Sequence, residues 1–412
     1  MPGPAASSRT DRTSPERSRR ARTAIFVTVL LDLLGFGMIL PILPFYGQAH
    51  GAGEIEVGLL FAAYSAAQLV FAPMLGRLSD RVGRRPVLLA TIAAGLLAHL
   101  VFAAAGTFWL LVAARAAAGA AAGNLGIAQA YVADVTAPGE RSRAMGMLGA
   151  AFGLGFVLGP AFGGFLALAG RVAVPLGAAA LSALNLAMAA AWLPESLAPE
   201  LRARRRGARW LDPRALGRVA ADRPLLGLMV LFFLVTFAIS LMEATLALFV
   251  QRRFGFGDWE TSWLFVLVGV VMVAVQGGMV GPAVKRWGER RLIPAGMGAM
   301  AGGLLLVGAA AAVAPLVGGL ALLALGAGLH NPSTLGLLSQ LARADEQGGV
   351  LGLSRSFGSL ARTVGPLAGT WIFARAGAPW PFWTAGLLMA ASLVLAAWVV
   401  RRAGGREEAA GG

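Results

Sequence analysis

Three ionisable side chains that could take part in proton coupling lie inside long apolar stretches of the sequence. Asp32 lies in the first stretch, Arg115 in the fourth and Glu243 in the seventh. A charged side chain at the centre of a membrane helix costs about 2.5–3.5 kcal/mol on insertion scales, and such residues are usually functional. We expect Asp32 to carry a proton, Arg115 to pair with its carboxylate, and Glu243 to bind a second proton or a cationic substrate. The alternatives are a static Asp32–Arg115 pair and a solvated Glu243 near the outer surface.

Other polar side chains also lie within the apolar stretches. Arg355 and Arg362 are seven residues apart and share a helix face. They line a cavity or extend toward the cytoplasmic surface, which the position of Arg355 favours. His330 is expected to form a polar contact between helices. The candidates for the lining of a substrate cavity are Tyr64, Gln68, Asn124, Gln129, Gln276 and Asn331.

The sequence has no pattern typical of an enzyme or of a bound metal. It contains no Ser/His/Asp constellation, no phosphate-binding loop, no metal-ligand spacing and no cysteine. Without a nucleotide motif, transport driven by ATP has no support. We therefore expect no catalysis, no metal and no cofactor.

Composition places the chain in a membrane. Of its 412 residues, 57% are hydrophobic and 13% are charged, and the mean hydropathy is +0.71. Soluble domains average about 25% charged residues, and disordered chains have low hydrophobicity. A soluble enzyme and a disordered chain are both excluded, which leaves an all-α protein that crosses the membrane several times.

A membrane-spanning helix needs about 20 mostly apolar residues. The sequence contains twelve such stretches, joined mostly by short loops. The predicted spans are 24–45, 55–76, 87–105, 108–132, 143–168, 174–193, 225–250, 260–283, 292–314, 316–342, 350–374 and 380–400.

The net charge of +15 fits the topology of a membrane protein. A basic soluble chain would suggest nucleic acid. Here most cations fall in loops on one side if both termini are cytoplasmic, as the positive-inside rule requires. We therefore expect no nucleic-acid partner. The predicted parts are a basic tail (1–22), a six-helix bundle (23–195), a basic linker (196–223), a second six-helix bundle (224–401) and a tail (402–412).

The two predicted bundles repeat each other. The segment GRLSDRVG (76–83) matches GPAVKRWG (281–288) at an offset of 205 residues. At an offset of 206, Glu140, Gly146, Gly159, Pro160 and Gly163 match Glu346, Gly352, Gly365, Pro366 and Gly369. Because six helices is an even number, the two copies have the same orientation in the membrane, which is one known plan of transporters.

The turn between the second and third predicted helices is a candidate gate at the cytoplasmic ends of the bundles. Its charges could hold two bundles together in one state and release them in another. The alternative is a positively charged anchor with a helix cap. The residues concerned are Gly76, Asp80, Arg81, Gly83, Arg84 and Arg85.

The fifth predicted helix is rich in glycine and contains one proline. Glycine lets helices approach closely, and proline can bend a helix. We expect either simple tight packing or a close, hinge-prone contact with a helix of the second bundle that also limits ion leakage. The packing residues are Gly155, Gly159, Pro160 and Gly163.

Several of these segments together resemble the major facilitator superfamily, and in particular its twelve-helix drug/proton antiporters, including the tetracycline/proton antiporters. The resemblance is dense in the first half of the chain and weaker in the second. It favours the gate over the anchor for residues 76–85. The segments that carry it are LDLLGFGMILPILPF (31–45), GRLSDRVGRRPVLL (76–89), LLVAARAAAGAAAG (110–123), AYVADVTAPGERSRAMG (130–146) and GLGFVLGPAFGG (153–164).

The resemblance implies a fold of twelve helices in two parallel six-helix halves, with substrate bound between them near the midplane. It implies export of a small amphipathic compound in exchange for protons by a functional monomer in the bacterial inner membrane. The alternatives are proton-coupled uptake of a metabolite, such as a sugar or nucleoside, and lipid transport. A membrane sensor that transports nothing is a further, less favoured alternative.

Overall fold

The computed structural model of the protein describes residues 15–136, 138–197, 217, 221–342 and 347–411. Within these ranges the chain is helical and contains no strand. Most of the expected linker and the first part of the basic tail lie outside the described residues, as does Glu346 of the predicted repeat. Counting a helix and its direct continuations as one rod, the described residues form twelve rods. Eleven of them are long and apolar enough to cross a membrane, and the remaining one is α17.

The first half of the chain forms six rods, two of which are interrupted. The first rod ends where Pro41 interrupts the helix, and the fourth is broken at Gly123, so the single helices expected over 24–45 and 108–132 are each divided. The elements are α2 (Pro15–Ile39), α3 (Leu43–Ala49), α4 (Glu54–Val82), α5 (Arg84–Ala103), α6 (Phe108–Ala121), α7 (Asn124–Val135), η2 (Pro138–Glu140), α8 (Arg141–Ala167) and α9 (Ala173–Trp192).

The second half also forms six rods. Its second rod contains a π-helical turn, η3, over the sequence VQGGM. The last helix continues to Gly411, well into the expected tail. The elements are α12 (Arg223–Phe254), α13 (Asp258–Ala274), η3 (Val275–Met279), α14 (Val280–Trp287), α15 (Glu289–Ala309), α16 (Val313–Leu341), α17 (Gln347–Ala376) and α18 (Trp380–Gly411).

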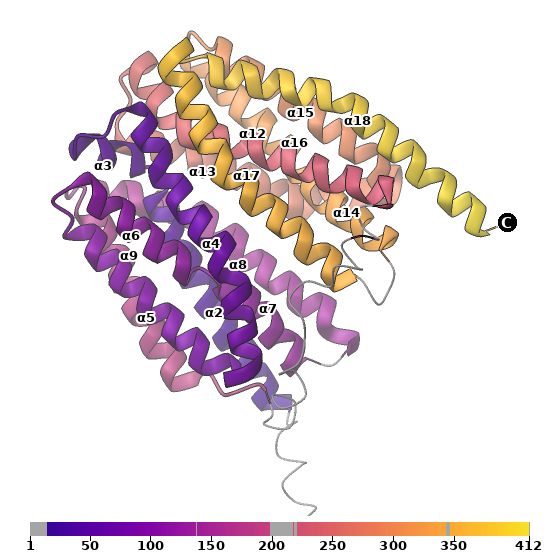
Figure 1. Cartoon of the computed structure of the whole chain (residues 1–412), viewed down its shortest axis with the longest axis horizontal. Helices are drawn as coiled ribbons and strands as arrows, with labels where there is room; N and C mark the ends of the chain where they lie inside the picture. Colours follow the sequence, from indigo (N-terminus) through magenta and orange to yellow (C-terminus); the bar gives the residue numbers. More distant parts are fainter. Residues whose placement is uncertain (1–14, 137, 198–216, 218–220, 343–346, 412) are drawn as a thin grey trace, which may run out of the picture.

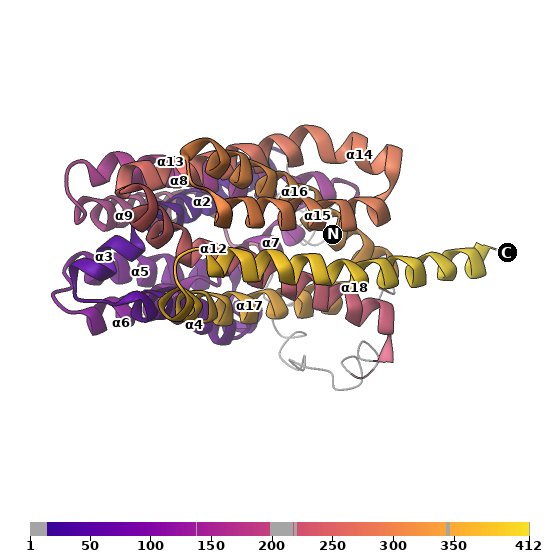
Figure 2. The same cartoon turned by 90° about the horizontal axis from the view of Figure 1, so that it is seen from above.

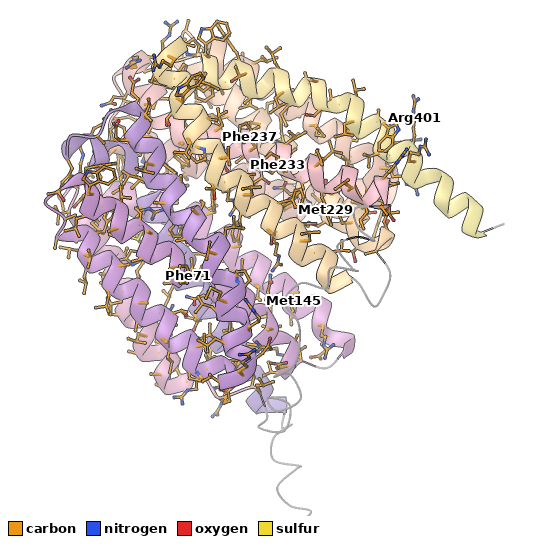
Figure 3. All side chains as sticks on the ribbon, in the orientation of Figure 1. Phe71, Met145, Met229, Phe233, Phe237 and Arg401 are labelled. Atoms are coloured by element: carbon orange, nitrogen blue, oxygen red, sulfur yellow. The ribbon has the colours of Figure 1, made fainter. Side chains whose placement is uncertain are left out.

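The two halves lie side by side, with the purple helices of the first half beside the orange helices of the second (Figure 1, Figure 2). Met229, Phe233 and Phe237 mark the course of α12 through the second half, whereas Arg401 lies at its edge on α18 (Figure 3). We call the end that carries α3 the α3 end, and the opposite end, where α4 meets α5, the α5 end.

Two pairs of helices join the halves, and they correspond to each other in the internal repeat. The second rod, α4, packs against the eleventh, α17, and the fifth rod, α8, packs against the eighth, α13. Gly58 allows the first approach, because a Cβ built on it would lie 2.9 Å from the Pro366 carbonyl oxygen. Gly164 allows the second, since its Cβ would lie 2.7 Å from that of Ser262. The symmetry of these contacts agrees with the predicted repeat.

Candidate substrate and proton site

A cavity of about 330 Å³ lies between the halves. The first half contributes Asp32 and Arg115 to its lining, and the second contributes Glu243 and Arg362. The ionisable residues expected in the membrane core therefore meet in one place. The rest of the wall is largely apolar and aromatic, including Phe36, Phe61, Phe152, Phe156 and Phe265. Such a wall suits an amphipathic molecule.

Asp32 is held by a short chain of hydrogen bonds within the first half. Asn124 donates from its Nδ2 to the Asp32 carboxylate at 3.2 Å, and Thr91 donates to the Asn124 amide oxygen. Asn124 and Thr91 are both 3% exposed. Because the amide oxygen already accepts from Thr91, the amide nitrogen is the atom turned toward Asp32. Asn124 is the first residue of α7, so the break in the fourth rod places it there.

Arg115 does not pair with Asp32, contrary to expectation. Its guanidinium lies over the Tyr64 ring, 4.4 Å from the centroid, and its Nε donates to the Leu60 carbonyl at 3.4 Å. The described residues contain no ion pair between Arg115 and Asp32, although both lie close enough to Tyr64 to act on it electrostatically. The sequence places both residues within spanning helices, but it does not fix the direction in which each side chain points around its helix axis.

Glu243 lines the central cavity and not a separate outer vestibule. The charge of Arg362, on the neighbouring α17, acts on it. Arg362 is exposed to the cavity, whereas Arg355, two turns earlier on the same helix, donates to Gln129 of the first half. The two arginines therefore have different surroundings despite their shared face.

Five of the six expected cavity residues line the cavity, namely Tyr64, Gln68, Asn124, Gln276 and Asn331. Gln129 does not, because it accepts the hydrogen bond from Arg355. Gln68 also donates to the Ala122 carbonyl at 3.2 Å, at the break between α6 and α7. His330 is fully buried and lies 3.2 Å from the Thr334 hydroxyl and 3.5 Å from the Ile293 carbonyl, which is the interhelical contact expected for it.

Sequence reasoning missed four polar lining residues: Ser65, Thr91, His99 and Ser240. His99 lies 3.1 Å from the Ser182 hydroxyl. His99 could have been predicted as a lining residue, because it is a polar residue within an apolar stretch. Thr91 and Ser240 gave no such signal, because a threonine or serine in a helix usually bonds its own backbone.

Three glycines of the fifth helix, Gly155, Gly159 and Gly163, contact α2 of the same half and not a helix of the second half. A Cβ on Gly159 would lie 2.7 Å from the Gly37 Cα, and one on Gly163 would lie 2.9 Å from the Met38 Cα. The expected close contact with the second half does exist, but at Gly153 and Gly164, which face α13. Gly155 and Pro160 also face α2. α8 thus has glycines on two faces, one packed against α2 of the first half and one against α13 of the second.

Three of the candidate gate residues, Asp80, Arg84 and Arg85, take part in a polar cluster at the α5 end, whereas Arg81 is exposed. Arg84 is 3% exposed, lies 2.7 Å from Asp80 and donates to Asp134 at 3.2 Å. Glu195 accepts from the backbone N–H groups of Arg84 and Arg85, at the start of α5. Gly83, with φ of 126°, provides the reversal between α4 and α5. All of these contacts lie within the first half, whereas the gate was expected to join the halves.

At the α3 end, two ion pairs connect the halves. Glu54, the first residue of α4, pairs with Arg252 near the end of α12. Arg171, between α8 and α9, lies 2.9 Å from Asp258, the first residue of α13. Each arginine also lies over an aromatic ring of its own half, Arg252 over Phe373 at 4.8 Å and Arg171 over Phe45 at 5.8 Å. The halves are therefore held together at this end.

The chain matches known transporters over most of its length. The family model described as the Major Facilitator Superfamily matches residues 25–281 and 260–411. The tetracycline resistance protein of class C from Escherichia coli is 33% identical over 373 residues, covering 88% of this chain and 92% of that protein. The human major facilitator superfamily domain-containing protein 10 is 31% identical over 407 residues, covering 87% and 89%.

Solved structures agree with the sequence matches. The crystal structure of the human organic anion transporter MFSD10 has a TM-score of 0.71 and 30% sequence identity, and covers 93% of this chain and 100% of that one. The nucleoside transporter NupG has a TM-score of 0.75 at 12% identity, which shows a shared fold alone. With its twelve rods in two six-helix halves, the chain belongs to the major facilitator superfamily, and it is a membrane transporter and not an enzyme.

Proposed function

We propose that the protein exports a small amphipathic compound in exchange for protons. The observation that carries this proposal is the Asp32 carboxyl, which is held by Asn124 in a largely apolar cavity between the halves. A carboxyl in that position can bind a proton and release it when the cavity opens to the other side. The tetracycline resistance proteins among the relatives support export of a drug-like compound.

We further propose that the α5 end faces the cytoplasm of a bacterial inner membrane, that both termini lie there, and that the monomer is the working unit. Alternating access would then open one end while the other closes. The ion pairs at the α3 end fit a state closed to the outside. The Arg84 cluster would act when the α5 end closes, and substrate would contact Tyr64, Gln68, Gln276 and Asn331.

The test is the pH gradient across everted membrane vesicles that contain this protein. Respiration acidifies the vesicle lumen, and an exporter would let protons leave as substrate enters. Tetracycline and other lipophilic drugs are the compounds to add. We expect at least one of them to dissipate the gradient, with the effect reduced to the level of empty vesicles by Asp32→Asn and unchanged by Glu56→Gln, an exposed acid outside the cavity.

Proton-coupled uptake is the second candidate. The human relative whose structure is titled an organic anion transporter is 30% identical, and Arg115 and Arg362 are cavity cations that could hold an anion. Uptake predicts no dissipation in everted vesicles and substrate-dependent acidification of right-side-out vesicles. That pair of results would overturn export.

A further inference from the structure

Two residues that the second half contributes to the cavity wall have a side-chain oxygen that no protein group satisfies. Ser240 Oγ and Asn331 Oδ1 are buried without a hydrogen-bond partner, and both residues line the cavity. Within the described part of the chain, no hydrogen bond or ion pair engages the Glu243 carboxyl or the Arg362 guanidinium. A buried polar group without a partner costs about 1–3 kcal/mol. These two buried oxygens lie in one wall with the Glu243 carboxyl and the more exposed Arg362 guanidinium, which indicates that something other than the protein supplies partners there.

Helix packing brings these groups together. Ser240 and Glu243 are three residues apart on α12 and therefore share a face. Gly365 lets α17 approach α12 at this level, because a Cβ on it would lie 3.0 Å from the Ser240 Cβ. Arg362 precedes Gly365 by one helical turn, and Asn331 joins from α16. Donors and acceptors from three helices thus converge on one wall.

The first half differs in this respect. The Asp32 carboxylate accepts from Asn124, whose amide oxygen accepts in turn from Thr91. Arg115 is 3% exposed and packs over the Tyr64 ring. These groups have protein partners, which suits a site that holds a proton. The unsatisfied groups of the second half suit a site that binds a ligand.

We propose that the second half binds the polar head of the substrate, and that this head is zwitterionic. An anionic group faces Arg362, and a cationic group faces Glu243, while Ser240 and Asn331 hydrogen-bond to the same head. The apolar body of the substrate packs against the aromatic wall. This assignment rests on the proposed function, because it takes the cavity as the place where substrate binds.

The charges explain why both signs are needed. A purely cationic head would pair with Glu243 but would lie beside the arginine charge of α17. A purely anionic head would pair with Arg362 and lie beside the carboxylate. A zwitterion satisfies both, and hydrogen bonds to charged groups are the stronger ones in proteins. We therefore expect the zwitterion to bind about ten-fold more tightly than either singly charged analogue.

The experiment uses three fluorescent probes with the same dansyl body and different heads. They are Nε-dansyl-lysine (zwitterion), dansylcadaverine (cation) and N-dansyl-6-aminohexanoic acid (anion). Binding to the purified full-length protein is measured by the rise in dansyl fluorescence. The expected order places the zwitterion first. Glu243→Gln should remove its advantage over the anion, and Arg362→Gln should remove its advantage over the cation.

Two further variants control for position and for folding. Arg355→Gln removes an arginine on the same helix face that is bonded to Gln129, and it should leave the order of the probes unchanged. Ser240→Ala removes one hydroxyl without changing a charge, and it should lower the affinity for the zwitterionic probe about three-fold. Ser240→Ala keeps the test decisive if a charge variant fails to fold.

Equal binding of the three probes, or a zwitterion preference that survives both Glu243→Gln and Arg362→Gln, would overturn the proposal. Binding needs no proton gradient, so the result is independent of the export assay. Drug-driven proton exchange without a zwitterion preference would refute this inference alone. A zwitterion preference that depends on Glu243 and Arg362, without proton exchange, would refute the export mechanism alone.

Discussion

The two ion pairs at the α3 end should favour the state in which that end is closed. Charge reversal at Glu54 tests this contribution most directly, because its partner Arg252 belongs to the other half. Glu54→Arg turns the attraction between the halves into repulsion. The exchanged double variant, Glu54→Arg with Arg252→Glu, restores the attraction with the charges in reversed positions.

The size of the effect follows from the exposure of the pair. The Arg252 side chain is 54% exposed and that of Glu54 is 25% exposed, so solvent screens their interaction. A pair of this kind contributes about 0.2–1 kcal/mol. Removing it by Glu54→Gln should shift the ratio of open to closed states by about 1.5- to 5-fold, and reversal, which adds repulsion of similar size, by up to about 30-fold.

The stacking of Arg252 over Phe373 does not directly change the ratio of open to closed states. Phe373 lies in α17, in the same half as Arg252, so the ring positions the guanidinium without joining the halves. Arg252→Glu forfeits that contact. We therefore expect the exchanged variant to recover most of the closed state, within about two-fold of the original protein, and not all of it.

The assay uses a single thiol, which the absence of cysteine from the sequence makes possible. Leu246 lines the cavity on α12. Leu246→Cys is treated from outside intact cells with a charged, membrane-impermeant methanethiosulfonate, and the rate of modification reports opening of the α3 end. The rate should rise from Glu54→Gln to Glu54→Arg and fall again in the exchanged variant. An exchanged variant as fast as Glu54→Arg would refute this reasoning.

Three further predictions concern contacts within the first half. Asn124→Ala removes the donor to Asp32 and should displace the pH midpoint of drug-driven proton exchange by at least half a unit, measured against external pH; an unchanged pH profile would contradict a positioning role. Gly159→Ala forces a Cβ to within 2.7 Å of the α2 backbone and should cost about 1–3 kcal/mol, seen as a lower unfolding temperature in detergent, whereas Gly149→Ala, in open space, should not lower that temperature. Arg84→Ala leaves the carboxylates of the α5-end cluster without their buried cation and should cost about 3 kcal/mol by the same assay, with Arg84→Lys restoring only part of it because lysine lacks the planar fork.

The rods and their repeat could be predicted from the sequence, because length and hydropathy alone define a spanning helix. Eleven of the twelve expected stretches agree with helices apolar enough to cross a membrane. The twelfth, α17, is also a long helix, but Arg355 and Arg362 lower its hydropathy. It can carry them because it lies between the halves, where one face meets the cavity and α4.

Partners across helices could not be predicted in the same way. The spacing of Gly155, Gly159 and Gly163 predicts a close contact but does not say which helix fills it, and that helix is α2. Likewise, Asp32 and Arg115 both line the cavity, but the rotation of each helix decides their partners, which are Asn124 and Tyr64. The breaks at Pro41 and Gly123 follow from residue types that the sequence displays, yet only packing decides whether a helix bends or ends there.

The most direct test of the account separates proton coupling from transport itself. Purified protein is reconstituted into liposomes, and a drug that dissipates the vesicle gradient is followed in two modes, namely exchange between labelled and unlabelled drug and accumulation driven by an imposed pH gradient. The account predicts that Asp32→Asn retains exchange at a rate near that of the original protein while losing accumulation. Accumulation that persists in Asp32→Asn would contradict the central claim that this carboxyl carries the coupled proton.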